Sequence, residues 1–252
     1  LRQEMRKASQ LQFDNPELKK MKPLLLLQKK LSHVPSNGEL LIERIISKEG
    51  HHVFFYPFEG RNVHEGMAAL VAYRLSKSQE LSVSMAMNDY GFELLSETEI
   101  EQPEERLRDL FSIDHLQRDL RSSMNATEMA KRRFRDIANI AGLVFTGYPG
   151  KEMKARHLNS STSLLYDVLK DHEPDHPLLL QADEELTYFQ FEEIRMRAAL
   201  ERIGNSELLV RKVDRMSPFA FPIMVDRLRE KMSNEKLVNR IEKLVKSLEK
   251  EA

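Results

Sequence analysis

The segment from residue 51 to residue 66 constrains the fold most, because it holds a strand, a corner and a helix start in one short stretch. Residues 52–56 form an apolar, aromatic run that is typical of a buried strand. Pro57 and Gly60 then predict a corner, and residues 63–76 carry apolar side chains at helical spacing. The chain is therefore expected to run from the sheet directly into a helix that packs against it.

The neighbouring segments supply partners for this strand. Residues 40–46 read as a strand that pairs with 52–56 in an antiparallel hairpin. Residues 81–87 and 92–95 flank a polar turn and predict a second hairpin. Residues 208–213 read as one more strand, which we expect to return to the same sheet. The prediction is an α+β fold: a small antiparallel sheet crossed by a helix, followed by a large helical region that returns one strand.

We expect one intertwined domain over residues 1–252. Residues 1–36 form a helical lead-in, in which a helix over 11–31 is broken or kinked at Pro16 and Pro23. Residues 37–98 form the strand-rich module, and residues 99–252 are mainly helical with a strand near 207–213. Two helices are expected last, one over 218–232 and one from Asn234 onward. The first of these is predicted to bury one face made of Phe221, Val225, Leu228 and Met232.

Composition narrows the classes of function. The chain has 39 Lys and Arg against 40 Asp and Glu, so a nucleic-acid contact requires a local basic patch. It has no Cys, which excludes disulfides and thiolate metal sites. No apolar run approaches the roughly 20 residues that span a bilayer. We expect a soluble, cytoplasmic protein.

The clearest basic patch lies on a helix predicted over residues 126–141, with Asn125 at its start. Its apolar face is predicted to contain Ala130, Phe134, Ile137 and Ala141. Lys131, Arg132 and Arg135 fall on the opposite face, where they can line up on a phosphate backbone. The alternative is an ordinary solvated helix face.

The loop after this helix has glycine spacing that suggests a phosphate loop. Gly142 and Gly147 fit, but Tyr148 and Pro149 stand where a phosphate loop has Lys and Ser or Thr. Nucleotide binding by such a loop is therefore excluded. Tyr148 remains available to stack on an unpaired base, beside the cations Lys151, Lys154 and Arg156. The alternative is a tight connection between helices with an exposed tyrosine.

Other polar clusters are less suited to catalysis. His51, His52 and His64 lack the His-Glu-x-x-His spacing of zinc proteases. No metal site is therefore predicted, and no residue is predicted to be catalytic. Glu59 and Arg61 are instead expected to form a structural ion pair that holds the corner, with Asp89 as a further partner.

Several blocks together resemble one protein family. They occur in the family's order at residues 51–66, 88–95, 132–138 with 142–145, 147–150, 160–168 and 218–222. On these blocks the chain resembles the DEAD/H-associated C-terminal domain of DNA-ligase-associated, Lhr-type helicases. The blocks are mostly structural in kind, so the seven candidate DNA-binding residues rest on their chemistry alone.

The resemblance implies an accessory domain without a motor. In such helicases RecA-like motor domains and a winged-helix domain lie upstream, bind ATP and magnesium, and move 3′-to-5′ on single-stranded DNA in repair. This domain would help to hold the tracking strand and brace the motor, and would bind no cofactor itself. Its implied partners are single-stranded or tailed DNA, those upstream domains, and an ATP-dependent DNA ligase with its associated nuclease.

Two other interpretations stay open. A protein-interaction or scaffold domain would use the same cationic faces on acidic partners instead of DNA. A metal-dependent hydrolase would use the histidines near Pro57.

Overall fold

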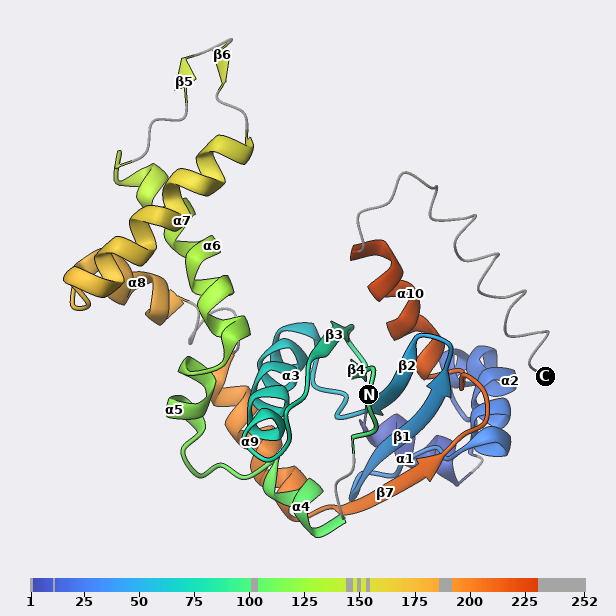
Figure 1. The fold of residues 1–252 in the computed structure, drawn as a ribbon. Coiled ribbons are helices and arrows are strands. Elements are labelled where there is room, and N and C mark those ends of the chain that lie inside the picture. The colour runs from blue at the N-terminus through green and yellow to red at the C-terminus, as the bar shows by residue number, and fades with distance from the viewer. Residues whose placement is uncertain are drawn as a thin grey trace.

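The computed structural model describes residues 2–10, 12–100, 104–143, 147–148, 151–152, 155–185 and 192–230 (Figure 1). The elements that build the sheet side are α1 (Arg2–Ser9), α2 (Pro16–Leu31), β1 (Glu39–Ser47), β2 (Gly50–Phe55), α3 (Arg61–Ser76), β3 (Val83–Met87), β4 (Phe92–Ser96), β7 (Glu207–Lys212) and α10 (Ala220–Glu230). Between β4 and β7 lie α4 (Glu104–Asp109), α5 (Leu116–Arg121), α6 (Met124–Ile140), β5 (Gly147–Tyr148), β6 (Lys151–Glu152), α7 (Ala155–His172), α8 (Pro177–Glu185) and α9 (Glu193–Gly204).

The predicted strands form a five-stranded sheet in the order β3-β4-β2-β1-β7. Both hairpins are present, with Ser47 opposite Gly50 in the first and Met87 opposite Phe92 in the second. The predicted return of the last strand is confirmed, but β7 lies parallel to β1, so the sheet is mixed. A parallel neighbour needs a crossover connection, and the long helical region that ends in α9 provides it.

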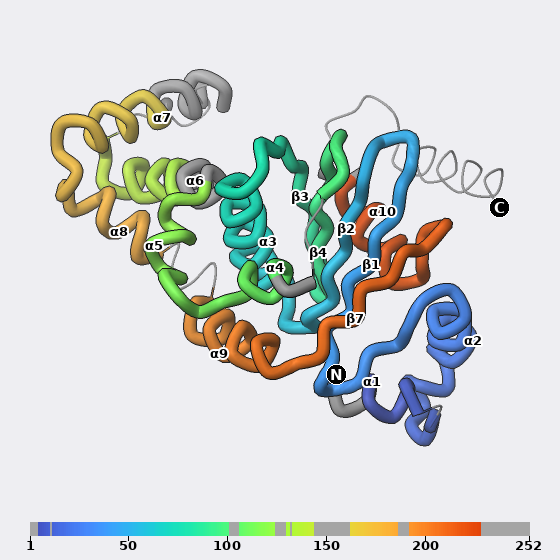
Figure 2. Tube along the Cα trace, turned by 60° about the horizontal axis from the view of Figure 1, so that its bottom comes forward, coloured from blue at the N-terminus to red at the C-terminus, as the bar shows by residue number. Residues whose placement is uncertain are grey.

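Helices cover both faces of the sheet, which explains why β2 is apolar at successive positions (Figure 2). On one face Val53 and Phe55 pack against α3, whose Met67 and Leu70 are fully buried. On the other face Phe54 and Tyr56 pack in a second core with Ile223 and Met224 of α10. A third, smaller core joins α1 and α2. None of the helices in the described part of the chain has the length and apolarity that crossing a membrane requires.

The two prolines of the lead-in have different effects. Pro16 begins α2, and the Asn15 side chain caps the helix by accepting a hydrogen bond of 2.7 Å from the Leu18 amide. Pro23 does not end the helix, which continues to Leu31. Because few of its side chains are buried, α2 presents most of its surface outward.

The α10 helix packs on the sheet as predicted, but the predicted face was wrong. Its buried side chains are Ala220, Ile223, Met224 and Arg227. Phe221 and Val225 are only half-buried; the Leu228 side chain, Met232 and the helix expected from Asn234 lie outside the described residues. Polar contacts determine which face of α10 is buried, because charged side chains anchor α10 and the turn before it to the sheet.

Two carboxylates buried in the sheet provide these anchors. Glu43 of β1 accepts hydrogen bonds from Tyr56 (2.7 Å) and Ser217 (2.5 Å). Burial, reinforced by the Glu43 charge, raises the pKa of the Tyr56 hydroxyl well above its usual value. Glu93 of β4 lies 2.5 Å from His52 Nδ1 and 3.1 Å from Arg227 Nε. The sheet thus sets the rotation of α10 by its charged groups as well as by its apolar ones.

The α6, α7 and α8 helices project from the body as an arm, with the β5–β6 hairpin at its tip (Figure 1). The predicted apolar face of α6 is confirmed at Ala130, Phe134 and Ile137, and the Phe134 ring meets Tyr166 of α7 edge-on at 5.5 Å. Ala141 lies beyond the helix end and is exposed. Asn125 lies inside the first turn instead of capping it, because α6 begins at Met124.

Candidate nucleic-acid interface

The corner after β2 has an unusual backbone. Phe58 has a φ of 57° and Gly60 a φ of 96°, and the former is rarely adopted by a bulky residue. Glu192, which lies opposite in the fold, also has a positive φ of 45°. Strained positions of this kind concentrate at functional sites and persist only where their surroundings hold them.

A buried histidine holds this corner. His64 Nε2 accepts a hydrogen bond of 3.0 Å from the Glu59 amide, and its Nδ1 lies 2.6 Å from the Asn88 carbonyl. The ring is therefore neutral with its proton on Nδ1, and burial lowers the pKa of His64 to about 4. His64 is a structural bridge between two loops. Among the described residues no three His, Cys, Asp or Glu side chains are placed to hold a metal ion.

The second loop, residues 88–91, fits closely against the corner. The Phe58 amide donates to the Tyr90 carbonyl at 3.2 Å, and the Asn88 side chain accepts from the amides of Tyr90 and Gly91. A Cβ on Gly91 would lie 2.3 Å from the Phe55 carbonyl oxygen, so only glycine fits there. Gly91 therefore has a structural role, because it lets the two loops approach each other closely.

Glu59 has an ion-pair partner that the sequence did not predict. The Glu59 carboxylate pairs with Arg202 of α9, whose Nη2 lies 2.8 Å from Oε1, and the Glu59 carbonyl accepts a hydrogen bond from Arg195 at 2.7 Å. Arg61 contributes its backbone amide to Asp89 at 3.2 Å. Because Arg61 is the first residue of α3, its side chain points outward at the end of the helix and is exposed.

These contacts bring together a set of exposed groups that we call the corner surface: Arg61, Asn62, Tyr90 and Arg195. The Tyr90 side chain is 51% exposed although its backbone is fixed. Asn62 and Arg195 both contact Glu192, which partly offsets the positive charge. An exposed aromatic ring on the same surface as two guanidinium groups can stack on an unpaired base while the cations contact phosphates.

The predicted basic face of α6 is only partly open. Lys131 was expected to face solvent, but its Nζ lies 2.9 Å from Asp167 of α7 and its side chain is 20% exposed. It braces two helices of the arm, because α7 packs beside this edge of α6. The Arg135 side chain is 34% exposed, with Nε 3.7 Å from Asp136. The Arg132 side chain lies outside the described part.

The other predicted residues lie near the tip of the arm. Tyr148 and Lys151 face each other across the β5–β6 hairpin, and Arg156 lies in the first turn of α7. Their side chains, and all of Lys154, lie outside the described residues. The chain therefore carries these positions on the arm, apart from the corner surface on the body (Figure 1).

Sequence reasoning identified the corner but missed its exposed groups. An aromatic residue in the polar turn at Tyr90 was a usable signal, since turns are otherwise small and polar. Arg195 gave no signal, because its position beside Glu59 depends on how α9 packs.

Comparison with known proteins identifies the family. The model of the DEAD/H-associated family matches residues 34–220. The ATP-dependent helicase Lhr-Core protein 2 of Thermococcus barophilus is 31% identical over 202 residues, which are 79% of this chain and 23% of that protein. The ATP-dependent helicase Lhr-Core of Methanocaldococcus jannaschii is 24% identical over 84% of this chain and 25% of its own length.

A solved structure shares the fold. The helicase Lhr of Mycobacterium smegmatis, bound to single-stranded DNA and AMP-PNP, matches with a TM-score of 0.65 and 21% identity, over 84% of this chain and 28% of the other. The chain thus spans about a quarter of the length of these relatives. Since the family model matches most of the chain, this protein belongs to the DEAD/H-associated family, whose domains occur in Lhr-type helicases.

Proposed function

We propose that this chain is an accessory domain of an ATP-dependent, Lhr-type helicase and that it holds the single strand along which the motor moves. The observation that carries the proposal is the family match over residues 34–220 in a chain that corresponds to a quarter of proteins named as ATP-dependent helicases. The motor domains, with their ATP and magnesium, would belong to other parts of the helicase, beside a winged-helix domain. The proposal includes 3′-to-5′ movement, a role in DNA repair in the cytoplasm, and cooperation with a DNA ligase and nuclease.

The corner surface is the first place where this domain would contact the strand. Tyr90 supplies a ring for stacking, and Arg61 and Arg195 supply charges for neighbouring phosphates. The loops beneath are held by Glu59, Arg202 and His64, so little conformational freedom would be lost on binding.

The arm is the second place. Arg132 and Arg135 of α6, with Tyr148, Lys151, Lys154 and Arg156 near the tip, remain candidates for contacting a strand that extends beyond the body. Lys131 would contribute less, because it already pairs with Asp167.

The test is fluorescence anisotropy with single-stranded oligonucleotides at several salt concentrations. Each phosphate neutralised adds about −0.7 to the slope of log affinity against log salt. We expect the double variants Arg61→Glu/Arg195→Glu and Arg132→Glu/Arg135→Glu each to weaken binding for all sequences and to flatten the slope by roughly one to two units. Tyr90→Ala should weaken binding without changing the slope, because it removes stacking alone.

The control is Lys20→Glu/Lys30→Glu, which makes the same charge change on the exposed side of α2. It should leave affinity and slope closer to wild type than the other two double variants do. Wild-type binding by both the corner and the arm variants would contradict the proposal that these surfaces hold DNA.

A scaffold role without direct DNA contact is the second candidate, because the arm exposes apolar side chains. Leu164 is 66% exposed and Val168, one turn further along α7, is 45% exposed. Exposed apolar residues grouped on one helix face mark protein contacts. If this role is correct, Leu164→Ser/Val168→Ser should weaken binding to a separately expressed helicase motor fragment, while the DNA affinity of this domain stays low in all variants.

A further inference from the structure

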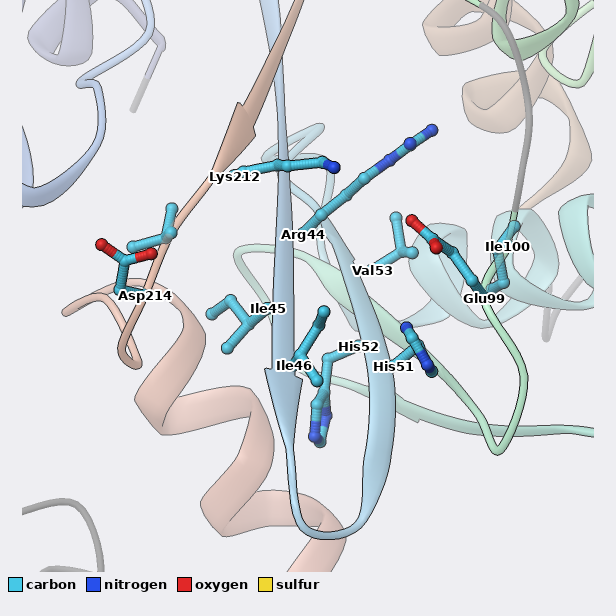
Figure 3. Close-up of a pocket in the computed structure, with 11 residues that line it drawn as sticks. Arg44, Ile45, Ile46, His51, His52, Val53, Glu99, Ile100, Lys212 and Asp214 are labelled. Carbon is cyan, nitrogen blue, oxygen red and sulfur yellow. The ribbon is translucent and has the colours of Figure 1, made fainter. Parts of the chain in front are cut away.

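Charge is balanced in one part of the molecule and segregated in two others. A pocket of about 260 Å³ at one end of the sheet is lined by two cations and two carboxylates: Arg44, Lys212, Glu99 and Asp214 (Figure 3). In contrast, α2 holds five lysines against one glutamate, and the arm from residue 167 to residue 185 holds seven acidic residues against one lysine. Two surfaces of opposite charge attract each other, and this attraction orients their encounter.

The cationic surface also exposes apolar side chains. Leu24 and Leu27 of α2 are 40% and 48% exposed. The exposed Lys20 lies on the same side one turn before Leu24, and the exposed Lys30 lies about one turn after Leu27. We call these four residues the α2 stripe. Exposed leucines grouped on one helix face mark a protein contact, and the lysines beside them favour an acidic partner.

The acidic surface has the same pattern with the opposite charge. Leu164 and Val168 of α7 are 66% and 45% exposed. The exposed Asp171 follows Val168 by three residues and therefore lies on the same side of the helix. We call these three residues the α7 stripe. Its apolar side chains and its charge both complement the α2 stripe.

The two stripes are too far apart to meet within one molecule. The α2 helix lies at the end of the body away from the arm, and the α7 helix lies in the arm, as both views show (Figures 1 and 2). A contact between the stripes therefore joins α2 of one copy to α7 of another. Such a contact is heterologous, so every added copy still offers one stripe of each kind to a further copy.

We propose that copies of this chain associate head to tail, with the α2 stripe of one copy packed against the α7 stripe of the next. The leucine and valine side chains form the apolar centre, and the lysines contact the acidic end of α7. The association is weak, because two helices of 16 and 18 residues bury less than the roughly 1,200 Å² of a stable interface. It is independent of the proposed DNA binding, because neither stripe shares a residue with the corner surface or with the candidate cations of the arm.

Sedimentation velocity of the whole chain tests the proposal, at protein concentrations from about 1 µM to about 1 mM. We expect the weight-average mass to rise with protein concentration beyond that of a dimer. Added salt should lower this mass, because it screens exposed charges. Leu24→Ser/Leu27→Ser should weaken the association at least about tenfold, because it removes the apolar centre on one side.

Charge reversal tests which surfaces meet. Lys20→Glu/Lys30→Glu makes the α2 stripe acidic, and Asp171→Lys/Asp175→Lys makes the exposed end of α7 basic. Each variant alone should associate at least about tenfold more weakly, because its two stripes then carry the same sign of charge. An equimolar mixture should associate again, because each variant offers the other a stripe of opposite charge. This recovery would also show that both variants are folded.

Arg61→Glu/Arg195→Glu is the matched control, since it makes the same charge change on the corner surface. It should associate like the wild type. A chain that stays monomeric at about 1 mM, wild-type association in either charge-reversal variant, or a mixture that fails to associate would overturn the proposal. A monomeric chain whose binding to the separately expressed motor fragment is lost in Lys20→Glu/Lys30→Glu would assign the α2 stripe to the motor instead.

Discussion

Replacing Arg227 with Met should destabilise the domain strongly, because Arg227 neutralises a carboxylate that has no access to water. Glu93 is 0% exposed and Arg227 is 4% exposed. Removing one partner of a buried ion pair costs about 3–5 kcal/mol. We expect a cost at the lower end of this range for two reasons. Glu93 would still have His52 as a partner at 2.5 Å, and its contact with Arg227 Nε is an ion pair without hydrogen-bond geometry.

A loss of about 3 kcal/mol predicts a clear thermal shift. For a domain of this size each kcal/mol lowers the melting temperature by about 2–4 °C, so Arg227→Met should melt roughly 6–12 °C lower. Thermal unfolding followed by circular dichroism measures this. Arg211→Met, an exposed arginine on β7, should change stability by no more than about 0.5 kcal/mol.

The double variant Glu93→Gln/Arg227→Met separates the ion pair from lost packing. If the charge of Glu93 causes the instability, neutralising it should recover about 1 kcal/mol or more relative to the sum of the single effects. A melting temperature of Arg227→Met equal to that of the wild type would refute the reasoning. Strictly additive single effects would show that packing alone holds α10 on the sheet.

Two further predictions concern His64 and the face of α10. Burial lowers the pKa of His64 from 6.5 to about 4. Between these two pH values His64 is protonated in the unfolded chain but stays neutral in the folded chain. The free energy of unfolding should therefore fall by up to about 3 kcal/mol as the pH is lowered from 6.5 to about 4. In urea unfolding at several pH values, His64→Gln should lose stability less steeply in this window, and parallel curves would contradict the assignment. Met224→Asp should lower the free energy of unfolding by more than about 3 kcal/mol, because Met224 is 3% exposed. Val225→Asp should lower it clearly less, because Val225 is only half-buried. Equal losses of stability in urea unfolding would mean that the buried face of α10 is assigned wrongly.

The sheet could be predicted from sequence because its signals are local. The turns at residues 48–50 and 88–91 fix both hairpins, and apolar runs mark the strands between them. The face of α10 could not be predicted, because it depends on Arg227 meeting Glu93 in a distant strand. A charged residue in a strand, such as Glu93, ordinarily indicates a solvent-facing position, and nothing local indicates that it is buried.

In the candidate site, too, local features could be predicted from the sequence and contacts between distant segments could not. The corner itself was found from Pro57 and Gly60, which act on their own neighbours. Its ion pair with Arg202 was missed, because Arg202 comes from α9, far along the chain. The helical spacing of α6 placed Lys131 on the side opposite the apolar face. Lys131 is nevertheless not open to solvent, because α7 covers that side and contributes Asp167 as its partner.

The parallel pairing of β1 with β7 has a consequence for the order of folding. The two hairpins close over short loops and can form early, whereas β7 must find β1 across roughly 160 residues, at a loop-closure cost of about 4–5 kcal/mol. Contacts of such long sequence separation slow folding. During synthesis the outer edge of β1 therefore stays unpaired until residue 212 has emerged, and a ribosome that stalls within the helical arm would present an apolar strand edge to chaperones.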